Sequence, residues 1–490
     1  MKSKKEKIAY FNSKASDRER WRAKNRYYHS SVGKLIDFLV PQGKSVLDIG
    51  CGTGSLEFCL KRENMVGVDF APEMLAVARD RMDLGIGARF IEDDVEDLKL
   101  KQQFDYVILS DLIGELQDVW EAIRNLHKVT HDESRIIITY YNALWEPVLK
   151  LAEKVGWKMP QDYQNWLSLQ NIENLMRLND FEIISSGYDL LLPKYIPGLS
   201  HIINKYIAKL PLVNQLCLSN YIVARPAKKS PLPVELPSVT VLIPCRNEKG
   251  NIENGVQRVP MMGRHTEILF VDGNSNDGTV EEIERVIAKY KGKLDIKLLH
   301  QVDPGSSDGA GHGKMLKLGK GDAVRKGFLR ANGDILMILD ADLTVPPEDL
   351  PKFYHALLES KGEFINGSRL VYPMEKEAMR SLNKIANKFF GMMFSWLLGQ
   401  QVTDTLCGTK ALYKKDYLKI VEGRAFFGDF DPFGDFDLLF GAAKQNLQIR
   451  EVPIRYRERV YGDIKIERFK HGLLLFKMTW IAMKKLKFRW

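Results

Sequence analysis

The chain has 490 residues, of which 45% are hydrophobic and 28% charged, and its formal net charge at pH 7 is +9. The hydrophobic share is that of a globular protein with real cores, and the length, at about 100–200 residues per domain, predicts two or three domains. The mild basic excess favours anionic ligands such as nucleotides, phosphates, nucleic acid or an anionic membrane surface, and it is equally compatible with no special partner.

The cysteines and the N-terminus indicate a reducing compartment. The five cysteines are scattered and form no CxxC pair, so we expect neither a disulfide framework nor a zinc site. The N-terminus is basic but has no apolar stretch of the kind that a signal peptide carries. Nowhere do about 18 uncharged apolar residues run together, so we predict no transmembrane span and a cytoplasmic protein.

One proline-rich segment divides the chain. RPAKKSPLPVELPS, from Arg225 to Ser238, contains four prolines and has neither a helical nor a strand period, which is typical of a domain boundary. On each side of it, strand-like runs alternate with glycine- or asparagine-rich turns and helical patterns. We therefore predict an α/β fold in two domains, residues 1–225 and 238–490, joined by a linker over residues 226–237.

The α/β pattern of the first domain begins with SVLDIGCGTG. A strand over residues 45–49 ends in a turn with three glycines, which let the backbone turn sharply and approach a ligand closely. The next two strands end in acidic residues: MVGVD ends at Asp69, where a carboxylate is placed to bind a ribose diol, and ARFIEDD ends at Asp93 and Asp94. A fourth strand, FDYVILS, a helix and the strand RIIITYY complete the pattern.

These motifs, in this order, resemble the class I S-adenosylmethionine-dependent methyltransferases over roughly residues 30–190. The resemblance implies a Rossmann-like fold and S-adenosylmethionine as a cofactor. The implied cofactor-binding residues are Asp48, Gly50, Gly52 and Gly54 on the methionine side, Asp69 at the ribose, and Asp93 or Asp94 at the adenine. The alternative is another nucleotide-binding Rossmann domain, which would carry G-x-G-x-x-G in place of the observed G-x-G-x-G.

Two residues are candidate general bases for methyl transfer. Asp111 lies just past the fourth strand, where the methyl group of the cofactor is expected, whereas His127 falls in the amphipathic pattern VWEAIRNLHKV and fits a helix surface better. Residues 195–224 mix apolar and basic side chains. They either close this domain or cover a lipid-like acceptor, and closure is the preferred interpretation.

The strands of the second domain end in different motifs. These are PCRNE, VDGNSNDGT and, after the helical stretch GKGDAVRKGF, ILMILDADL. The last one delivers Asp340 and Asp342 to the carboxyl edge of a parallel sheet, which is the usual ligand edge. Two carboxylates this close repel each other unless a cation lies between them, and Mg²⁺ and Mn²⁺ prefer hard oxygen ligands completed by substrate phosphates. The pair therefore predicts a metal that neutralises a departing diphosphate.

Together with NGSRL, these motifs resemble family 2 glycosyltransferases of the GT-A fold, in particular the dolichyl- or polyprenyl-phosphate mannose synthases, over roughly residues 238–470. The resemblance implies a nucleotide-sugar donor and a divalent metal, Mg²⁺ or Mn²⁺. The implied site residues are Pro244, Asn247 and Glu248 at the nucleoside, Asp272 at the base or ribose, Asp340 and Asp342 at the metal, Arg369 at phosphate or sugar, Asp404 at acceptor or sugar, and Lys465 with Arg459 at the acceptor phosphate. Two positions depart from the family: Gly273 stands where a second aspartate is common, and Thr344 where the synthases tend to carry glutamine.

The acceptor decides which catalytic groups are needed. A hydroxyl acceptor needs a carboxylate base, for which Asp404 is the candidate. A polyprenyl phosphate is already ionised near neutral pH, so cations such as Lys465 and Arg459 would position it without a base. We take Asp342, Asp404 and Lys465 as the catalytic candidates. The acidic stretch FGDFDPFGDFDLLFGA is either part of the acceptor site or an acidic loop before a core helix.

Two short apolar stretches suggest peripheral membrane contact. NKIANKFFGMMFSWLLGQQ and the C-terminal FKHGLLLFKMTWIAMKKLKFRW are too short to span a bilayer, but both contain aromatics and the second ends in basic residues. A basic, aromatic, amphipathic helix suits the membrane interface. A core helix with a solvated basic end is the equal alternative.

The expected protein is a bifunctional enzyme. An S-adenosylmethionine-dependent methyltransferase precedes a metal-dependent inverting glycosyltransferase, which passes a sugar to a polyprenyl phosphate at the cytoplasmic face of the membrane. One alternative is that both halves act on hydroxyls of a surface polysaccharide or glycolipid. Another is that one half is a non-catalytic scaffold. We expect no nucleic acid partner.

Overall fold

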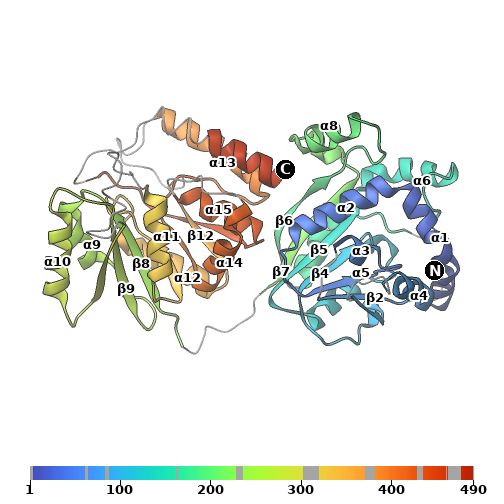
Figure 1. The fold of residues 1–490 in the computed structure, drawn as a ribbon, viewed down its shortest axis with the longest axis horizontal. Helices are drawn as coiled ribbons and strands as arrows, with labels where there is room; N and C mark the ends of the chain where they lie inside the picture. Colours follow the sequence, from blue (N-terminus) through green and yellow to red (C-terminus); the bar gives the residue numbers. More distant parts are fainter. Residues whose placement is uncertain are drawn as a thin grey trace. The chain divides into compact units, whose positions relative to one another are not determined.

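The chain folds into two compact units, Met1–Lys228 and Lys229–Phe488. The structure, a computed structural model, describes residues 4–60, 64–82, 88–161, 164–227, 235–301, 319–369, 381–426, 434–459, 461 and 476–488. Each unit is built around one sheet flanked by helices (Figure 1). The predicted fold class, two α/β sheets, is confirmed. Most of the predicted linker, residues 228–234, lies outside the described residues.

The first unit contains a seven-stranded sheet in the order β3-β2-β1-β4-β5-β7-β6. Its strands are β1 (Val46–Ile49), β2 (Met65–Asp69), β3 (Arg89–Glu92), β4 (Phe104–Ser110), β5 (Thr130–Tyr141), β6 (Phe181–Asp189) and β7 (Ser219–Pro226). Neighbouring strands are parallel except at β7, which runs antiparallel to both β5 and β6. The loops after β1, β2, β3 and β4 therefore meet at one carboxyl edge, where ligands of open α/β sheets bind.

Helices cover this sheet and bury both of its faces. They are α1 (Lys4–Lys24), α2 (Arg26–Leu39), α3 (Ser55–Leu60), α4 (Pro72–Met82), α5 (Val119–Asn125), α6 (Glu146–Lys154), α7 (Leu169–Leu178) and α8 (Leu199–Lys205). Leu47 of β1 belongs to the core on one face and Val46 to the core on the other, as expected for a strand with alternating side chains. α1, which precedes the stretch that carries the methyltransferase resemblance, packs through Phe11 and Ala15 against Met74 of α4.

The second unit contains another seven-stranded sheet, in the order β10-β9-β8-β11-β13-β12-β14. Its strands are β8 (Val239–Cys245), β9 (Thr266–Asp272), β10 (Asp295–His300), β11 (Ile335–Ile338), β12 (Phe364–Ser368), β13 (Lys410–Tyr413) and β14 (Ile449–Pro453). β13 is antiparallel to β11 and β12, and the other pairs are parallel. β8 lies between β9 and β11 and is parallel to both, so the predicted motifs that follow these three strands share one edge.

The helices of this unit include most of the first apolar stretch singled out in the sequence and the described part of the second. They are α9 (Ile252–Arg258), α10 (Thr279–Tyr290), α11 (Lys320–Arg330), α12 (Leu350–Leu358), α13 (Ser381–Leu398), α14 (Lys414–Glu422) and α15 (Asp435–Lys444). Residues 476–482 are helical and continue into a π-helical turn, η11 (Met483–Lys487). The C-terminal helix packs on α13, where the Phe390 and Phe476 rings lie 5.3 Å apart.

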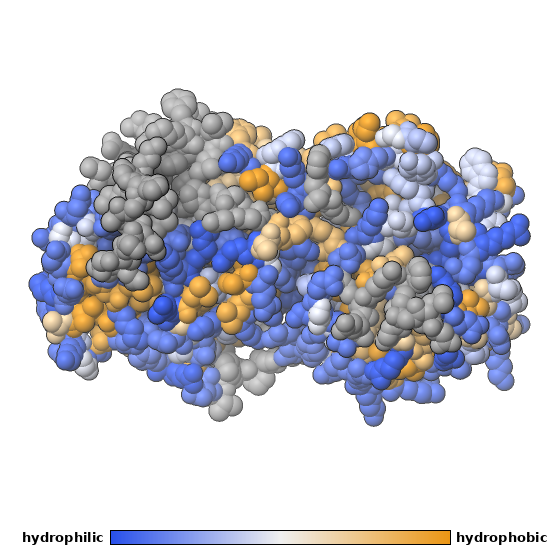
Figure 2. All heavy atoms as spheres, viewed as in Figure 1, coloured by the Kyte–Doolittle hydropathy of each residue, from blue (hydrophilic) through white to orange (hydrophobic). Residues whose placement is uncertain are grey.

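Within the described residues, no helix combines the length and apolar character that a bilayer crossing requires. Polar residues cover much of the face seen in Figure 2, and apolar residues gather at the upper edge of the first unit. The two apolar stretches of the second unit are partly core, because Phe394 and Met478 are buried, and partly surface, because Met392 and Trp480 are more than half exposed.

Candidate functional site

The turn after β1 has a backbone that only glycine adopts readily. Gly50, Gly52 and Gly54 have φ values of 75°, 54° and 68°, in the left-handed region that side chains disfavour. A Cβ on Gly50 would also lie 2.6 Å from a methyl carbon of Leu112. The Gly52 amide donates to Asp69 Oδ2 at 2.8 Å. The turn is thereby fixed to the end of β2.

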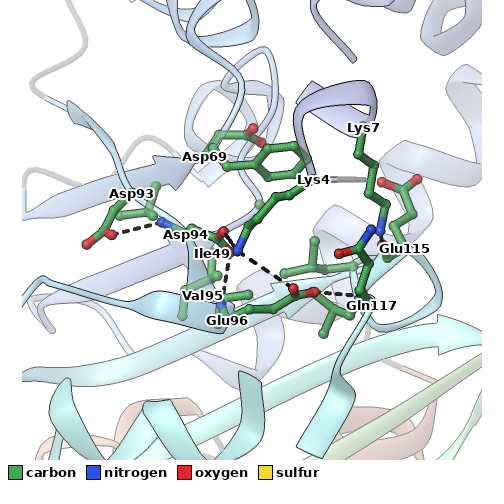
Figure 3. A pocket seen from close by; sticks show the side chains of 15 residues that line it. Lys4, Lys7, Ile49, Asp69, Asp93, Asp94, Val95, Glu96, Glu115 and Gln117 are labelled. Carbon is green, nitrogen blue, oxygen red and sulfur yellow. Dashed lines mark hydrogen bonds and ion pairs between the residues drawn. The ribbon is translucent and has the colours of Figure 1, made fainter. Parts of the chain in front are cut away.

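An open pocket of about 460 Å³ lies beside this turn (Figure 3). It brings together four of the seven residues predicted to bind the cofactor, namely Gly50, Asp69, Asp93 and Asp94. The loop after β4 supplies further wall residues, including Leu112, Glu115 and Gln117. Gly52 and Gly54 shape the turn without lining the pocket. The edge formed by β1 to β4 therefore encloses a space with acidic residues on one side.

Asp48 lies beneath the turn, outside the residues that line the pocket. It is buried beside Glu57 of α3, and neither Asp48 Oδ1 nor the two Glu57 carboxyl oxygens have a hydrogen-bond partner among the described residues. Burial, followed by the nearby Glu57 carboxyl, holds the pKa of Asp48 well above its usual range. Burial also raises the pKa of Glu57 to about 7. The pair retains protons more readily than free carboxyls and supports the turn from below.

The two aspartates after β3 have different partners. The Asp93 carboxylate accepts from the backbone amides of Asp94 and Leu100, both at 2.8 Å, and so fixes its own loop. The Asp94 carboxylate accepts from the Glu96 amide at 2.9 Å and forms an ion pair with Lys4. Asp94 is thus the one of the two that is also tied to α1.

α1 contributes to the pocket, which reasoning from the sequence missed. Lys4 and Lys7 line it, and Lys7 donates to the carbonyl oxygen of Glu115. Further along the helix, Arg18 lies against the glycine turn, because a Cβ on Gly52 would be 3.4 Å from Arg18 Nε. The one sequence signal for this contribution was the cluster of basic residues in α1. It lies outside the glycine and aspartate motifs from which the cofactor site was predicted.

Asp111, a candidate base, belongs to a buried polar cluster at the end of β4. The Tyr28 hydroxyl of α2 lies 2.9 Å from both carboxylate oxygens of Asp111. The ring of Tyr28 lies 5.5 Å from that of Tyr141 at the end of β5. Burial raises the pKa of Asp111 to about 6, against the opposing effects of Tyr28 and Arg22. A carboxyl with this pKa beside the cofactor edge is suited to accept a proton near neutral pH.

His127, the other candidate base, packs against neighbouring elements of the fold. Its ring stacks on Phe181 with centroids 4.1 Å apart, and Nε2 lies 2.8 Å from the carbonyl oxygen of Asn179. These contacts place it against β6 and the end of α7. The sequence preference for Asp111 over His127 agrees with this geometry.

In the second unit, the loops after β8 and β9 hold each other. The Asn247 amide donates to Ser275 Oγ, and the Asn276 amide donates to Asn247 Oδ1, both at 2.9 Å. The Asp272 carboxylate accepts from the Asn274 amide at 3.0 Å and from the Ser275 hydroxyl at 2.5 Å. Asn247 and Asp272 therefore lie in one structured edge, directly after paired strands.

The Asp340 and Asp342 carboxylates each face a basic side chain. Lys320 Nζ lies 2.6 Å from Asp340 Oδ1, and Arg459 Nη2 lies 2.5 Å from Asp342 Oδ2. Burial acts to raise the pKa of Asp340, but Lys320 and more remote cations outweigh it and lower the pKa. Thr344 donates its hydroxyl to Asp342 Oδ1 at 2.8 Å. Thr344, noted in the sequence as a departure, orients one of the predicted metal ligands.

Arg459 joins two of the predicted motifs. Besides Asp342, its guanidinium lies 3.8 Å from Glu248 Oε1, and Glu248 accepts from Asn251 Nδ2 at 2.8 Å. The side chain thus bridges the loop after β8 and the D-x-D segment after β11. Predicted from the sequence to lie at an acceptor phosphate, Arg459 contacts Asp342 and Glu248, which are the predicted metal and nucleoside residues.

The residues after β11 fit a divalent metal completed by a donor diphosphate. Asp340 and Asp342 offer hard oxygens, the ligand type that Mg²⁺ and Mn²⁺ prefer. A Cβ on Gly408 would lie 2.1 Å from Asp340 Oδ2, so only glycine leaves room for this carboxylate. No group of three or more His, Cys, Asp or Glu side chains suited to a metal gathers within the described part of the chain.

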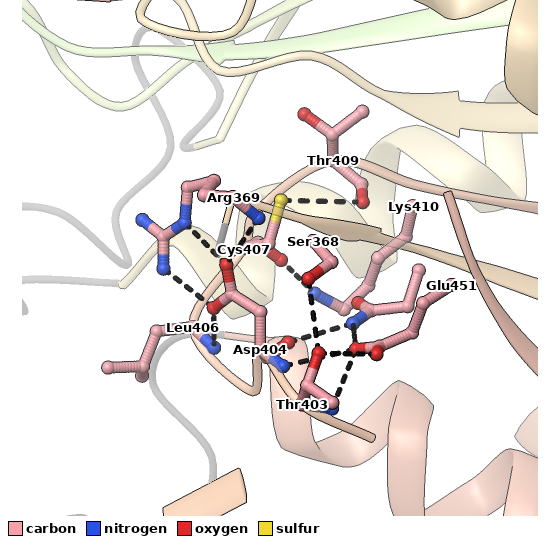
Figure 4. Close-up of polar contacts among 10 residues, drawn as sticks. Ser368, Arg369, Thr403, Asp404, Leu406, Cys407, Thr409, Lys410 and Glu451 are labelled. Carbon is pink, nitrogen blue, oxygen red and sulfur yellow. Dashed lines mark hydrogen bonds and ion pairs between the residues drawn. The ribbon is translucent and has the colours of Figure 1, made fainter. Parts of the chain in front are cut away.

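Arg369 and Asp404 form a buried bidentate ion pair (Figure 4). Arg369 Nε and Nη2 donate to the two Asp404 carboxylate oxygens at 2.7 and 2.8 Å. The Asp404 side chain is fully buried, and its backbone amide donates to Glu451 at 3.0 Å. Although burial disfavours the charge, Asp404 holds the pKa of Arg369 above its usual range. This carboxylate is engaged by a permanent cation.

We expect Asp404→Asn to lower the free energy of unfolding by about 3–5 kcal/mol, because Arg369 would keep a buried charge without its partner. Urea unfolding of the purified chain measures the change. Glu348→Gln is the matched control, because its pair with Arg258 is bidentate but half exposed. Its cost is expected below about 1 kcal/mol. Equal stability of the two variants would contradict the buried pair.

Some predicted residues lie outside the described residues. Lys465 and two aspartates of the acidic stretch, Asp429 and Asp431, are among them. The end of that stretch is described: Asp437 of α15 lies 3.0 Å from Arg424 Nε and is buried. The core-helix interpretation therefore fits residues 435–444.

The folds and edges described above define two classes of domain. The first has an S-adenosylmethionine-dependent methyltransferase fold with a glycine turn and an acidic pocket, and the second has an α/β fold with a D-x-D pair at the carboxyl edge of its sheet. Residues 23–186 match the family model described as a methyltransferase domain, and residues 240–307 and 316–421 match glycosyl transferase family 2. A methyltransferase domain match in the first unit is thus followed by a glycosyl transferase family 2 match in the second, and both resemblances seen in the sequence are confirmed.

Curated relatives match the second domain's class. A dolichol-phosphate mannosyltransferase of Pyrococcus furiosus is 28% identical over 234 residues, 47% of this chain and 59% of the relative. A dolichyl-phosphate hexose transferase of Haloferax volcanii is 33% identical over 159 residues, 32% of this chain and 65% of the relative. The chain thus spans less than two thirds of the length of these relatives.

Solved structures similar to this chain include methyltransferases. An S-adenosylmethionine-dependent methyltransferase of Thermotoga maritima is 20% identical with a TM-score of 0.36, over 45% of this chain and 99% of the other. A magnesium protoporphyrin IX methyltransferase of Synechocystis is 21% identical with a TM-score of 0.35, over 46% of this chain and its whole own length.

Proposed function

We propose that the first unit transfers a methyl group from S-adenosylmethionine and that the second transfers a sugar from a nucleotide-sugar to a polyprenyl phosphate. The names of the curated relatives, which refer to dolichol or dolichyl phosphate, support the acceptor class. The methyltransferase family match and the glycine turn support the cofactor. Asp69 and Asp94 would bind the ribose and adenine sides, and Gly50 would lie against the methionine side.

The observation that carries the choice of a phosphate acceptor is the Arg369–Asp404 pair. A hydroxyl acceptor needs a base, and the predicted base, Asp404, is buried and already engaged through both oxygens. A phosphate acceptor is itself ionised and needs none. Arg459 is one cation close to the reacting edge, and Lys465 is the second proposed from the sequence. The geometry therefore favours the lipid phosphate over a polysaccharide hydroxyl.

Asp340 and Asp342 would hold Mg²⁺ or Mn²⁺ with the donor diphosphate. The metal, when bound, neutralises charge on the departing diphosphate. The protein's own part is orientation: Thr344 aligns Asp342, and Gly408 leaves space for Asp340. Pro244, Asn247, Glu248, Asp272 and Arg369 are the proposed donor-binding residues.

We place the enzyme at the cytoplasmic face of the membrane, held peripherally. The C-terminal helix and α13 expose Phe389, Met392, Phe476 and Trp480, and η11 carries three lysines. Exposed aromatics beside lysines favour an anionic interface.

The test is a transfer assay with radiolabelled GDP- and UDP-sugars, membrane lipid and Mn²⁺. Label is expected in the solvent-extractable fraction, with nucleotide release that depends on added lipid. Label found only in water-soluble glycan would overturn the lipid acceptor and support the polysaccharide alternative. Calorimetry with S-adenosylmethionine tests the other half, because absence of heat would mark the first unit as a scaffold.

A further inference from the structure

The first unit exposes an unusual number of large apolar side chains on α6 and α8. On α6 and the residues that flank it, Leu144, Val148, Leu151, Val155 and Trp157 are all more than half exposed. Four of them follow at intervals of four, three and four residues, which is the spacing of one helix face. Only Leu149 of α6 is buried. The helix therefore turns its apolar stripe toward solvent.

The segment around α8 also turns large apolar side chains toward solvent. Tyr195, Leu199, Ile202, Leu210 and Leu216 are exposed, and Leu212 has the largest exposed fraction, 78%. Leu212 also has a φ of 70°, a strained value for a leucine, and such strain persists only where the surrounding structure imposes it. Figure 2 shows apolar residues at the upper edge of the first unit, over the position of α8 in Figure 1. We call the exposed residues of these two segments the apolar face.

Polar contacts link the two parts of the apolar face. Asn25, at the junction of α1 and α2, donates through Nδ2 to the carbonyl oxygen of Trp157 at 3.2 Å and accepts from Lys194 Nζ at 2.8 Å. Trp145 Nε1 donates to the carbonyl oxygen of Leu216 at 2.8 Å. One end of the α6 segment is thus hydrogen-bonded directly to the α8 segment, and the other end is linked to it through Asn25. The apolar face is one fixed surface.

The charged residues of the apolar face indicate an anionic partner. Residues 190–217 contain three lysines and one histidine but no aspartate or glutamate. Lys209 is buried against Asp189, whereas Lys194 is exposed and Lys205 partly exposed. On α6, Glu146 is paired with Lys150 at 2.5 Å. In the α8 segment, aliphatic side chains and a tyrosine lie beside lysines with no acidic residue, and on α6 both Glu146 and Glu153 are paired with lysines. This combination complements the anionic surface of a lipid bilayer.

We infer that the apolar face of the methyltransferase unit binds the surface of an anionic membrane. Exposed apolar side chains gathered on one surface of a soluble domain commonly mark an interaction site. A bilayer accepts scattered leucines at interfacial depth and needs no shape-complementary groove. The inference concerns a different surface from the C-terminal helix and is independent of the sugar acceptor, because vesicle binding is measured without any substrate.

The test is cosedimentation of the full chain with vesicles of phosphatidylcholine mixed with phosphatidylglycerol, and of phosphatidylcholine alone. Binding is expected to the mixed vesicles and to weaken with salt. Leu151→Glu and Ile202→Glu, one on each part of the apolar face, are each expected to reduce binding by about tenfold or more, because each leaves a charge where an apolar side chain would enter lipid.

The matched control is Leu178→Glu, which changes an equally exposed leucine at the end of α7. Its binding is expected to equal that of the unchanged chain, and S-adenosylmethionine affinity of all variants reports that they are folded. Three results overturn the inference: no binding of the unchanged chain, unchanged binding of both variants with loss in Trp480→Glu alone, or a dimer in solution that both variants convert to monomer.

Discussion

Asp342→Asn is expected to reduce sugar transfer by about a thousandfold, the scale on which one preorganised electrostatic group acts in a transition state. The substitution keeps the size of the side chain and its contact with Thr344 but removes the negative charge that a metal requires. It also leaves Arg459, 2.5 Å away, with less opposing charge. Nucleotide release with Mn²⁺ and lipid acceptor measures the loss, and calorimetry measures donor affinity with and without Mn²⁺.

Asp295→Asn is the control for that experiment. Asp295 begins β10 and bonds His265 at 2.9 Å, at the end of the strands opposite to the ligand edge. Its activity is expected to remain within a factor of about two, because surface substitutions away from special features have small effects. A donor affinity in Asp342→Asn that keeps its full dependence on Mn²⁺ would return the D-x-D segment to an ordinary turn.

Four strands that end at candidate site loops are followed by a non-glycine residue with positive φ. Asp111 directly follows β4, Asn247 and Asn274 are the second residues after β8 and β9, and Leu343 lies in the turn after β11. Their φ values are 56°, 53°, 62° and 54° in that order. Strained backbone of this kind is concentrated at binding sites because it directs neighbouring groups toward a ligand. The same backbone also occurs away from both edges, at Asp180, Leu190, Leu212, Ser360 and Asn446.

The sequence was sufficient wherever the signal was local. The glycine turn, the acidic strand ends and the D-x-D pair each depend on residues within one loop. The alternation of strands with helices indicated parallel strands, whose carboxyl ends share one edge of the sheet. The contacts that it could not supply join distant segments: Asp342 with Arg459, 117 residues apart, and Tyr28 with Asp111, 83 apart. Such partners are chosen by packing, which no local pattern encodes.

The motif that contains Asp404 did not determine the role of this residue. Its position in DTLCGTKAL suggested a base or positioning group, and a lone carboxylate would have suited either. The structure pairs it with Arg369, 35 residues away in sequence. Its catalytic role stays a prediction, and the stability measurement on Asp404→Asn must accompany any activity measurement.

Asp111→Asn is expected to reduce methyl transfer by about 10²–10⁴-fold, the contribution of a positioned general base. Because burial raises the pKa of Asp111 to about 6, the unchanged enzyme should gain activity as pH rises to that value and then level off. Carboxyl ¹³C NMR provides a readout that needs no methyl acceptor: a midpoint near pH 6 should disappear in the variant. A midpoint near the ordinary value of 3.8 would contradict the buried base.

Tyr28→Phe tests how the Tyr28 hydroxyl affects the pKa of Asp111. The Tyr28 hydroxyl donates to the charged carboxylate and so lowers the pKa of Asp111. Its removal is expected to move the activity profile toward higher pH without abolishing transfer. An unchanged profile would show that the Tyr28 contact does not control the proton.

Stability distinguishes lost chemistry from lost folding in Asp111→Asn. A folded pKa above the unfolded value favours the folded state fully below pH 3.8, and this contribution is lost as pH rises through about 6. Above that pH the unchanged chain holds a buried charge that the asparagine variant does not carry. The variant is therefore expected to be at least as stable at pH 8 while it transfers methyl groups far more slowly, which is the behaviour of a residue kept for chemistry at the expense of stability.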